Sequence, residues 1–516
     1  MNNESKSSIK KGFFVSLIVL IGKVLGFVKQ SVIAWAFGTT SGTDIYFAAD
    51  GYTSMFGQVM SQSISPSVLT NYVTLDEQKK KEEAVNLIRS CFIFFPLLAL
   101  TICIISIALS SLLSQLLGLS YTIEQRHILQ IYLISLCPII FLTALTGVSQ
   151  GYLEANQKFY PAKLCSLFFS ISIIIFVVVF KDGFGVNSLL IGFLVGYVAH
   201  TFFMLFIVFR KFKFRFVNPF KNIYFKKLLI RFFPLMIGVS IVDLGHFVDR
   251  IIASSLEDGS ISILYYGQVV STDLISSVII TTICIILLPS FTRMVANKMS
   301  QIDIIKKISL IFSYVCMFII ALSGLYIIEG FNLVKLFFER GNFTSSDSQL
   351  VYLVVCGYAY GFIFLAIREI LVRCHYAYGD TLRPMINSII GVVINIVLSI
   401  ILSRFLGTYG IAIATTISNF IIMILSFITL RKHITMCFFK KEFIVSLIKV
   451  FIAFSITFVL CYFAEKNLEF NYIIKLFLIS FIYVFLYFII LFIIREKYFL
   501  SMISKIFKKK RLENEQ

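Results

Sequence analysis

The segment YIIKLFLISFIYVFLYFIILFII, residues 472–494, decides the class of fold. It is a run of more than about 20 mainly apolar residues, which as an α-helix crosses the roughly 30 Å hydrocarbon layer of a bilayer. The whole chain has the same character, since 58% of its 516 residues are hydrophobic and only 14% are charged. Soluble domains carry about 25% charged residues. The sequence therefore predicts an all-α integral membrane protein and excludes a soluble globular fold.

Windows of this length predict about fourteen transmembrane helices. They lie near 12–37, 45–71, 86–113, 127–150, 161–180, 187–209, 229–254, 262–290, 308–329, 349–372, 384–404, 408–430, 443–464 and 472–494. The second is the least apolar, because residues 51–65 are mostly small and polar. Such residues suit the lining of a water-filled cavity better than a surface that faces lipid.

The positive charges predict the orientation of the chain in the membrane. Successive spans place the connecting segments alternately on the two sides of the membrane. Most of the 46 Lys and Arg residues fall in the segments of one side. The positive-inside rule makes this side the cytoplasm, so both the N and C termini are expected there. The net charge of +19 is explained by this topology, and no nucleic-acid partner is expected.

An internal repeat divides the spans into two groups. LGFVKQSVIAWAF begins at Leu25, and LGHFVDRIIASSL begins about 220 residues later at Leu244. Other matches at nearly the same offset predict two pseudo-symmetric six-helix lobes, as in transporters with parallel repeats that work by alternating access. The expected divisions are an N-lobe at 1–220, a C-lobe at 221–435, and two additional spans with a basic tail at 436–516.

Five charged residues in or beside the predicted spans are candidates for a substrate-binding cavity. They are Lys23, Lys29, Asp44, Asp50 and Arg250. A charge at the bilayer centre costs about 2.5–3.5 kcal/mol, so it is retained where water, a partner or a ligand offsets this cost. The cations favour an anionic substrate that contains phosphate. The alternative interpretation is that these side chains reach the membrane surface or form purely structural ion pairs.

A second set of polar residues in the spans is a candidate for ion coupling. It consists of Asp249, Asn387, Asn395, Thr415 and Thr416. The sequence has no Walker A loop, GxSxG or HExxH motif, so the chain is not expected to be an enzyme or to use ATP by itself. The ten Cys residues are scattered without metal-ligand spacing. No cofactor and no metal beyond sodium is expected, and the energy source is predicted to be Na⁺ or H⁺ coupling or the membrane potential.

Several stretches resemble one family of transporters. They are GKVLGFVKQSVIAWAFGTTSGTDIYFAAD (22–50), FVDRIIASSLEDGSISILYYG (247–267), LLPSF (287–291), LFFERGNFTSSDS (336–348) and YGDTLRP (378–384). Together they resemble the MurJ/MviN family of lipid II flippases, within the multidrug/oligosaccharidyl-lipid/polysaccharide exporter superfamily.

The resemblance implies a flippase that moves lipid II, the undecaprenyl-pyrophosphate-linked peptidoglycan precursor, from the inner to the outer leaflet of the bacterial cytoplasmic membrane. Its expected partners are this lipid-linked glycan, membrane lipids and the cell-wall synthesis machinery. Lys23 and Lys29 fall where the family has substrate-contacting arginines, and Asp44 falls on the family's aspartate. Asp249 falls on a position implicated in sodium binding, and the two additional spans resemble those that form a groove for the lipid tail.

Two departures from the family pattern leave other functions open. The second span has no basic residue, and Gly267 follows Tyr266 where the family usually has an arginine. One alternative is a flippase for another undecaprenyl-linked oligosaccharide, for capsule or another surface polysaccharide. A second is a cation-coupled exporter of small amphipathic compounds, and a third is a scaffold or enzyme subunit that transports nothing.

Overall fold

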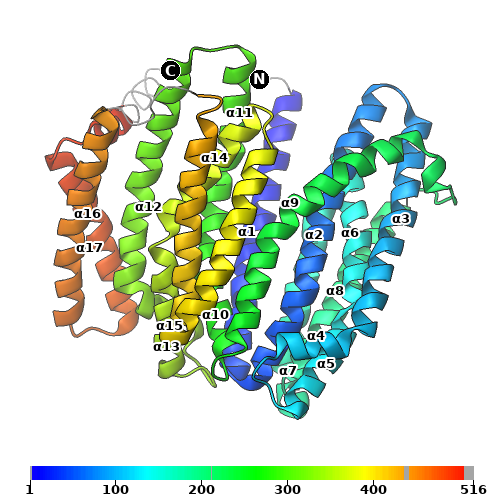
Figure 1. Cartoon of the computed structure of the whole chain (residues 1–516), viewed down its shortest axis with the longest axis horizontal. Coiled ribbons are helices and arrows are strands. Elements are labelled where there is room, and N and C mark those ends of the chain that lie inside the picture. The colour runs from blue at the N-terminus through cyan, green and yellow to red at the C-terminus, as the bar shows by residue number, and fades with distance from the viewer. Residues whose placement is uncertain (1–2, 211, 435–440, 505–516) are drawn as a thin grey trace. The chain divides into compact units, whose positions relative to one another are not determined.

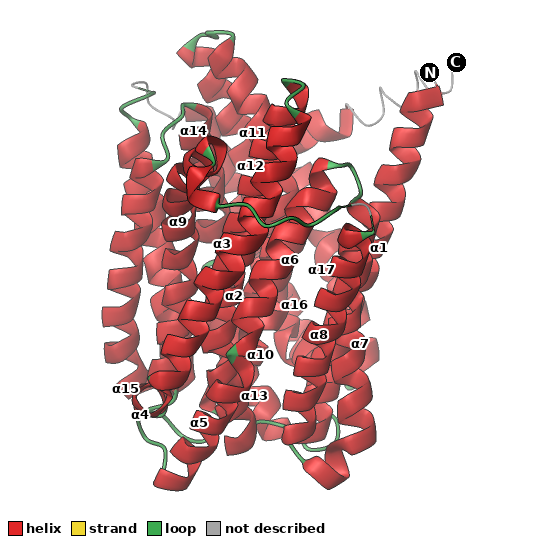
Figure 2. Ribbon diagram, turned by 90° about the vertical axis from the view of Figure 1, so that its right-hand side faces the viewer, coloured by secondary structure: helices red, strands yellow, loops and turns green. Residues whose placement is uncertain are grey.

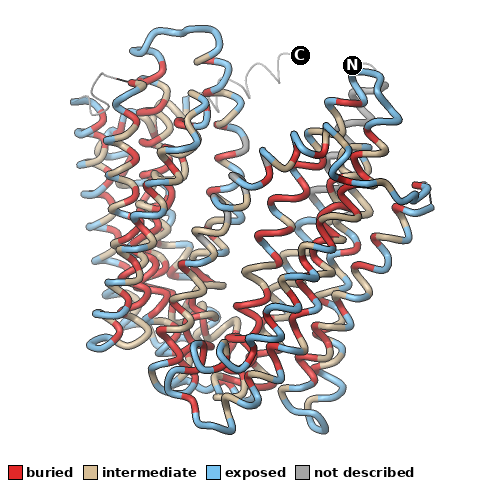
Figure 3. The backbone as a smooth tube through the Cα atoms, turned by 45° about the vertical axis from the view of Figure 1, so that its right-hand side comes forward, coloured by how far each residue is buried: buried red, intermediate tan, exposed pale blue. Residues whose placement is uncertain are grey.

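The computed structural model describes residues 3–210, 212–434 and 441–504, and in these residues it contains helices and no strand, as expected for an all-α chain (Figures 1 and 2). The chain forms two compact units. The first unit is Met1–Ser262 with Phe338–Thr344, and the second unit is Ile263–Phe337 with Ser345–Gln516. In each unit the buried residues lie on the helix faces that meet other helices, and the exposed residues lie outside (Figure 3).

The described residues of the first unit form nine α-helices. They are α1 (Asn3–Phe37), α2 (Ser41–Glu77), α3 (Lys81–Ala108), α4 (Ser110–Leu117), α5 (Ile123–Leu136), α6 (Pro138–Ala155), α7 (Phe159–Phe184), α8 (Asn187–Phe209) and α9 (Ile223–Ala253), with a short 3₁₀ helix at Pro219–Lys221 before α9. Small residues let these helices approach closely. On α8, a β-carbon at Gly192 would lie 2.9 Å from Phe176 Cβ of α7, and one at Gly196 would lie 3.0 Å from Phe169 Cα.

The turn between α1 and α2 depends on glycine and threonine. Gly38 ends α1 with φ +61°, a value that side chains rarely adopt, and a β-carbon there would lie 2.4 Å from the Asn342 carbonyl oxygen. Thr40 and Thr43 form a reciprocal capping box at the start of α2. The Asn342 amide donates to the Trp35 carbonyl oxygen at 3.0 Å. This contact explains why the short loop 338–344 packs with the first unit.

The second unit contains the remaining helices. They are most of α10 (Ser260–Gln268), two π-helical turns at Val269–Asp273 and Ser276–Ile280, α11 (Thr281–Ala296), α12 (Gln301–Phe338), α13 (Ser345–Ala359), α14 (Phe362–Ala377), α15 (Leu382–Leu430), α16 (Lys441–Asn467) and α17 (Tyr472–Ile493). α17 is apolar on all sides. One face, with Tyr483 and Tyr487, is buried in the unit, whereas Phe477, Phe481 and Phe485 are exposed on the other face, where lipid would cover them.

The helices lie at the positions predicted for the spans, but fewer of them meet the length and hydropathy expected of a membrane span. Helical segments occupy all fourteen predicted ranges. Within the described residues, ten helices are long and apolar enough to cross a membrane, or eleven when the bent pair α13 and α14 is taken as one span. α15 counts once among these, although it breaks at Gly407, where φ +58° and ψ −140° are not helical. The break separates the predicted spans 384–404 and 408–430, because glycine adopts this backbone conformation without steric cost.

Candidate functional site

A partly buried ion pair joins α2 to α9 in the first unit. Asp50 on α2 has one carboxylate oxygen 4.0 Å from Nη1 of Arg250 on α9. The same Nη1 donates a hydrogen bond to the Phe47 carbonyl oxygen at 3.0 Å, and Ser54 Oγ donates to the other Asp50 oxygen at 2.8 Å. The structure thus brings together two of the charged residues predicted to line the cavity.

Gly51 makes room for this pair. A β-carbon at Gly51 would lie 2.4 Å from Arg250 Nη1 and 2.9 Å from Arg250 Cδ. The guanidinium therefore crosses the surface of α2 where the helix has no side chain. The role of Gly51 could not be predicted from the sequence, because a glycine in a polar span gives no sign of which distant residue approaches it.

Lys29 is the third charged residue of this group. It lies on α1, is partly buried, and has its Nζ 4.7 Å from the centroid of the Phe169 ring on α7. The Asp50 carboxylate attracts it electrostatically. Lys29, Asp50 and Arg250, called here the charged cluster, therefore come from three helices of the first unit. Lys23, also on α1, is partly buried as well.

Asp44 has a different environment from the charged cluster. The residue is 2% exposed, and its carboxylate accepts hydrogen bonds from the Gly259 and Ser262 amides, both at 2.8 Å, and from Ser262 Oγ at 2.6 Å. The Ile261 amide donates a longer bond at 3.4 Å. These donors surround the start of α10, where a carboxylate satisfies helix N–H groups and complements the helix dipole. The geometry gives Asp44 a helix-capping role, and substrate contact by Asp44 stays a prediction.

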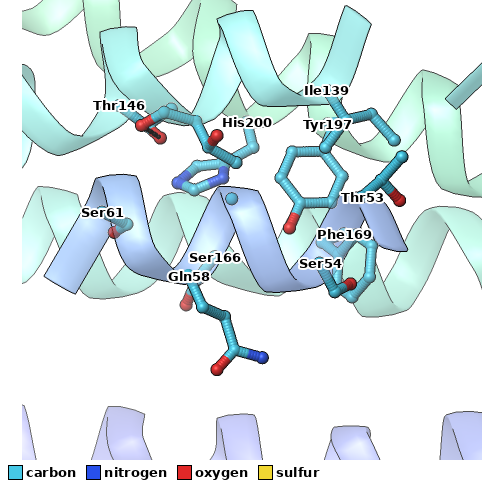
Figure 4. Close-up of a pocket in the computed structure, with 12 residues that line it drawn as sticks. Thr53, Ser54, Gln58, Ser61, Ile139, Thr146, Ser166, Phe169, Tyr197 and His200 are labelled. Carbon is cyan, nitrogen blue, oxygen red and sulfur yellow. Dashed lines mark hydrogen bonds between the residues drawn. The ribbon is translucent and has the colours of Figure 1, made fainter. Parts of the chain in front are cut away.

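A polar cavity of about 240 Å³ adjoins the charged cluster (Figure 4). Its lining comes from α2, α6, α7 and α8 and consists of Thr53, Ser54, Gly57, Gln58, Ser61, Ile139, Thr143, Thr146, Ser166, Phe169, Tyr197 and His200. Ser54 and Phe169 contact the charged cluster as well as the cavity. Gln58 and Ser61 belong to the polar stretch 51–65, which was expected to line a wet cavity. The volume and the hydroxyl groups suit several water molecules or a polar ligand.

His200 lines this cavity, although no role for it was predicted from the sequence. Its Nε2 is buried and has no hydrogen-bond partner within the described part of the chain. Figure 4 shows its ring beside Tyr197, also on α8, and near Ser61 of α2. The sequence signal was weak, because a single histidine in an apolar run has no spacing that predicts a ligand-binding role.

The residues predicted to couple an ion are only partly brought together. Asn395 donates from Nδ2 to Thr415 Oγ1 at 3.2 Å within α15. Asn387 bonds Thr429 instead, at 3.0 Å, and Thr416 donates to the Gly357 carbonyl oxygen at 2.7 Å. Asp249 is buried on α9 of the first unit. The second unit therefore holds Asn395 with Thr415 and gives Asn387 and Thr416 other partners.

A cluster of two histidines and a carboxylate lies at one end of the second unit. Asp380 Oδ2 lies 3.3 Å from His375 Nδ1 and 3.0 Å from His433 Nε2. These three side chains resemble a metal-ligand set. However, Arg383 Nη1 lies 2.7 Å from Asp380 Oδ2 and 2.9 Å from His433 Nε2, so a guanidinium already supplies the positive charge. The cluster joins the α14–α15 loop to the end of α15, and we assign it a structural role.

Known proteins are similar to this chain over most of its length. A family model described as "Lipid II flippase MurJ" matches residues 33–484. A probable lipid II flippase MurJ of Rickettsia prowazekii is 25% identical over 424 residues, which cover 79% of this chain and 81% of that protein. A probable lipid II flippase MurJ of Vibrio cholerae is 26% identical over 438 residues, with 82% of each chain covered.

Solved structures show the same fold. A lipid II flippase MurJ in an inward closed conformation superposes with a TM-score of 0.80 at 22% identity, covering 97% of this chain and all of that one. An inward-facing multidrug resistance transporter of the MATE family, from the MOP superfamily, gives a TM-score of 0.68 at 15% identity, covering 80% of this chain and 94% of that one. The likeness to the MurJ structure extends through nearly the whole chain. Since the family model also covers most of its length, this chain belongs to the lipid II flippase MurJ family.

Proposed function

We propose that this protein is a lipid II flippase, which moves the undecaprenyl-pyrophosphate-linked peptidoglycan precursor from the inner to the outer leaflet of the bacterial cytoplasmic membrane. The observation that carries the proposal is the family match over residues 33–484. The relatives' names favour lipid II over another lipid-linked oligosaccharide. Transport by alternating access, without a catalytic step, is the mechanism that a fold of this kind supports.

The proposed topology has fourteen transmembrane helices with both termini in the cytoplasm. Helices in all fourteen predicted ranges support the number, and the break at Gly407 supports counting α15 as two spans. The proposed lobes are the six-helix groups 1–220 and 221–435, followed by the additional pair in 436–516. α9 is the first helix of the second lobe by the repeat, although its contacts group it with the first compact unit.

The charged cluster is the proposed contact for the pyrophosphate. Asp50 keeps Arg250 and Lys29 compensated when no substrate is bound, because a partly buried cation is costly without an opposite charge. A pyrophosphate carries more negative charge than one carboxylate and offers more acceptor oxygens, so it competes with Asp50 for both cations. Lys23, on the same helix as Lys29, is proposed to extend this positive surface. The adjoining polar cavity is suited to the hydroxyl and amide groups of the sugar.

Arg250 also accounts for the missing basic residue of the second span. Its guanidinium crosses α2 at Gly51, so a cation lies against this span although α2 contributes none there. The proposed site therefore keeps positive charge where the family usually has it.

The proposed energy source is an ion gradient or the membrane potential. Asp249 in the first unit offers a carboxylate, and separately the Asn395–Thr415 pair in the second unit offers amide and hydroxyl oxygens. Oxygens of these kinds are the ligands that Na⁺ and similar hard cations use. Sodium or proton coupling at these residues, and contact with the cell-wall synthesis machinery, are proposals that rest on the family alone.

The test is complementation in a bacterial host whose own lipid II flippase is depleted. Expression of this chain should restore growth and the appearance of lipid II in the outer leaflet. Failure of rescue by a protein that is inserted in the membrane would contradict the proposal and point to another undecaprenyl-linked glycan. Resistance to amphipathic drugs on overexpression, with no effect on lipid II, would point instead to a small-molecule exporter.

A further inference from the structure

The second unit contains a basic cavity at the junction of α11 and α12, separate from the charged cluster of the first unit. Its volume is about 430 Å³. Its lining consists of Ile286, Pro289, Ser290, Arg293, Met294, Asn297, Met299 and Lys307. Pro289 lies inside α11, where its missing N–H removes one helix hydrogen bond and disturbs the regular packing of the helix. The cavity lies beside this interruption.

The two cations of this cavity have no acidic partner among the described residues. Lys307 Nζ donates a hydrogen bond to Ser290 Oγ at 2.6 Å. Within the described ranges, neither Lys307 nor Arg293 lies within ion-pair distance of a carboxylate, whereas the neighbouring Lys306 lies 3.9 Å from Asp303. Lys307 is also partly buried. A partly desolvated cation without a counter-charge is unfavourable, so this arrangement is stabilised when an anion binds.

The donors and the apolar wall together indicate the chemistry of that anion. A guanidinium, an ammonium and a hydroxyl around one cavity match the oxygens of a phosphate group, to which arginine can donate two parallel hydrogen bonds. Ile286 lies two helical turns before Arg293 on the same face of α11, and it is 68% exposed. Met294 and Met299 complete an apolar border. An apolar border beside a phosphate site suits a phosphate that is attached to a lipid.

We propose that this cavity binds the phosphate group of an anionic membrane lipid. The inference rests on the proposed topology, which places the α11–α12 turn at the cytoplasmic surface, where basic pockets between helices bind anionic headgroups. Binding neutralises Arg293 and Lys307 and holds the end of α11 against the start of α12. A lipid headgroup and free inorganic phosphate both carry the phosphate group that the cavity would bind. The experiment must therefore distinguish these two ligands.

The test measures binding by the purified full-length protein in a zwitterionic detergent. The probes are dioctanoyl phosphatidylglycerol, dioctanoyl phosphatidylcholine and inorganic phosphate, each titrated by microscale thermophoresis. Wild-type protein should bind phosphatidylglycerol more tightly than phosphatidylcholine. The double variant Arg293→Gln/Lys307→Gln should weaken this binding about ten-fold or more, because two charge-assisted hydrogen-bond donors are lost.

Lys306→Gln is the matched control, since it removes the same charge one residue away on α12 but outside the cavity. It should change the affinity by less than about two-fold, as expected for an exposed lysine. If the double variant does not fold, Arg293→Gln alone serves, because the Arg293 side chain makes no hydrogen bond within the described part of the protein. Lys307→Arg, which keeps the charge, should retain binding.

The outcomes separate the two sources and include a clear failure. Tight phosphatidylglycerol binding with weak inorganic phosphate binding supports a lipid headgroup as the ligand. Equal affinity for inorganic phosphate, lost in the double variant, overturns the lipid assignment in favour of a free anion. Equal binding of phosphatidylglycerol by the double variant and by Lys306→Gln overturns the site itself. None of these results depends on lipid II transport. The lipid-binding proposal and the proposed function can therefore each fail without the other.

Discussion

Arg250 forms an ion pair with Asp50, and Lys29, on another helix of the first unit, is attracted electrostatically by the same carboxylate. Lys29 also has its ammonium over the Phe169 ring. The charge of each cation is therefore compensated by other groups of the protein, as expected for a charged side chain in a membrane span. Their arrangement is what the proposed pyrophosphate contact requires, and it leads to two predictions for single residues.

Lys29→Ala should strongly reduce lipid II transport without preventing membrane insertion. A hydrogen bond to a charged group contributes about 1.5–3 kcal/mol, so its loss reduces transport about ten-fold or more. Lys29→Arg should retain activity, because the charge is preserved. The measurement is rescue of the flippase-depleted host, with protein in the membrane quantified. Lys466→Ala, at the exposed end of α16, is the control, and full activity of Lys29→Ala would contradict the cation-binding role.

Gly51→Ala should reduce transport although alanine is the better helix former. In an ordinary helix this change gains up to about 1 kcal/mol, but here the new methyl group would overlap Arg250. The displaced guanidinium should cost about ten-fold or more in transport, since small displacements at a binding site are costly. Gly183→Ala, at a helical site of α7 with nothing within 4 Å of its β-carbon, is the control and should be neutral or stabilising. Equal transport by both variants would show that Arg250 does not need its observed position.

At the scale of helices and loops, the contacts that join helix ends could not be read from the sequence. Asp44 was predicted to line a cavity, and the structure shows it bonded to the start of α10, about 215 residues away in the chain. In the second unit, Asp380 joins the α14–α15 loop to His433 beyond the end of α15. Hydrophobic periodicity locates helices, but it does not reveal which helix end a polar side chain will meet.

The Asp380 cluster should make the stability of the second unit depend on acid pH. Partial burial opposes ionisation, but hydrogen bonds from His433, the Arg383 amide and His375, with the nearby Arg383 charge, lower the pKa of Asp380 to about 2. The usual pKa of aspartate is about 3.9. A carboxylate with a lowered pKa stabilises the folded state above its unfolded pKa, and this contribution is lost as the pH falls through about 4 to about 2.

Asp380→Asn should therefore unfold at a lower temperature than wild type at neutral pH, and the difference should shrink between about pH 4 and pH 2. The measurement is the thermal unfolding temperature of the full-length protein in detergent over this range. Asp303→Asn, whose side chain is exposed beside Lys306, should show a much smaller difference at every pH. A gap between wild type and Asp380→Asn that does not change with pH would rule out the ionised carboxylate as its cause.

At the scale of the whole molecule, the proposed fourteen-span topology predicts which residues are accessible from each side of the membrane. Arg404 lies in the short segment before Gly407, on the predicted outer side, and Lys432 lies just after α15 on the predicted cytoplasmic side. Both residues are exposed. The nine cysteines of the described residues are all buried, so the background reaction of these nine should be low.

Arg404→Cys should react in intact cells with a thiol reagent that does not cross the membrane, and Lys432→Cys should react only after the membrane is opened. The measurement is labelling of the purified protein from each sample. The wild-type chain is the control for native cysteines. Labelling of Lys432→Cys in intact cells would contradict the predicted orientation, and protection of Arg404→Cys would contradict a break between two spans at Gly407.

The class of the protein, the positions of its helices and its family follow from the amino-acid sequence alone. Apolar runs long enough to cross a bilayer must be helical, because backbone groups in lipid can be satisfied only within the segment or in a closed barrel. The break in α15 was also predictable, since the apolar stretch is too long for one span and Gly407 divides it. The motifs at 22–50 and 247–267 were sufficient to indicate the family.

Which charged and polar residues lie together was decided by the packing of the helices. The tertiary structure placed Asp50 against Arg250 at Gly51, assigned Asp44 to the start of α10, and divided the predicted ion-coupling residues among different partners. It also revealed the polar cavity, with the buried Nε2 of His200, and the basic cavity at the α11–α12 turn. The physical reason is that the position of a helix along the chain follows from its own run of apolar residues. The partner of a polar side chain depends instead on how distant helices pack.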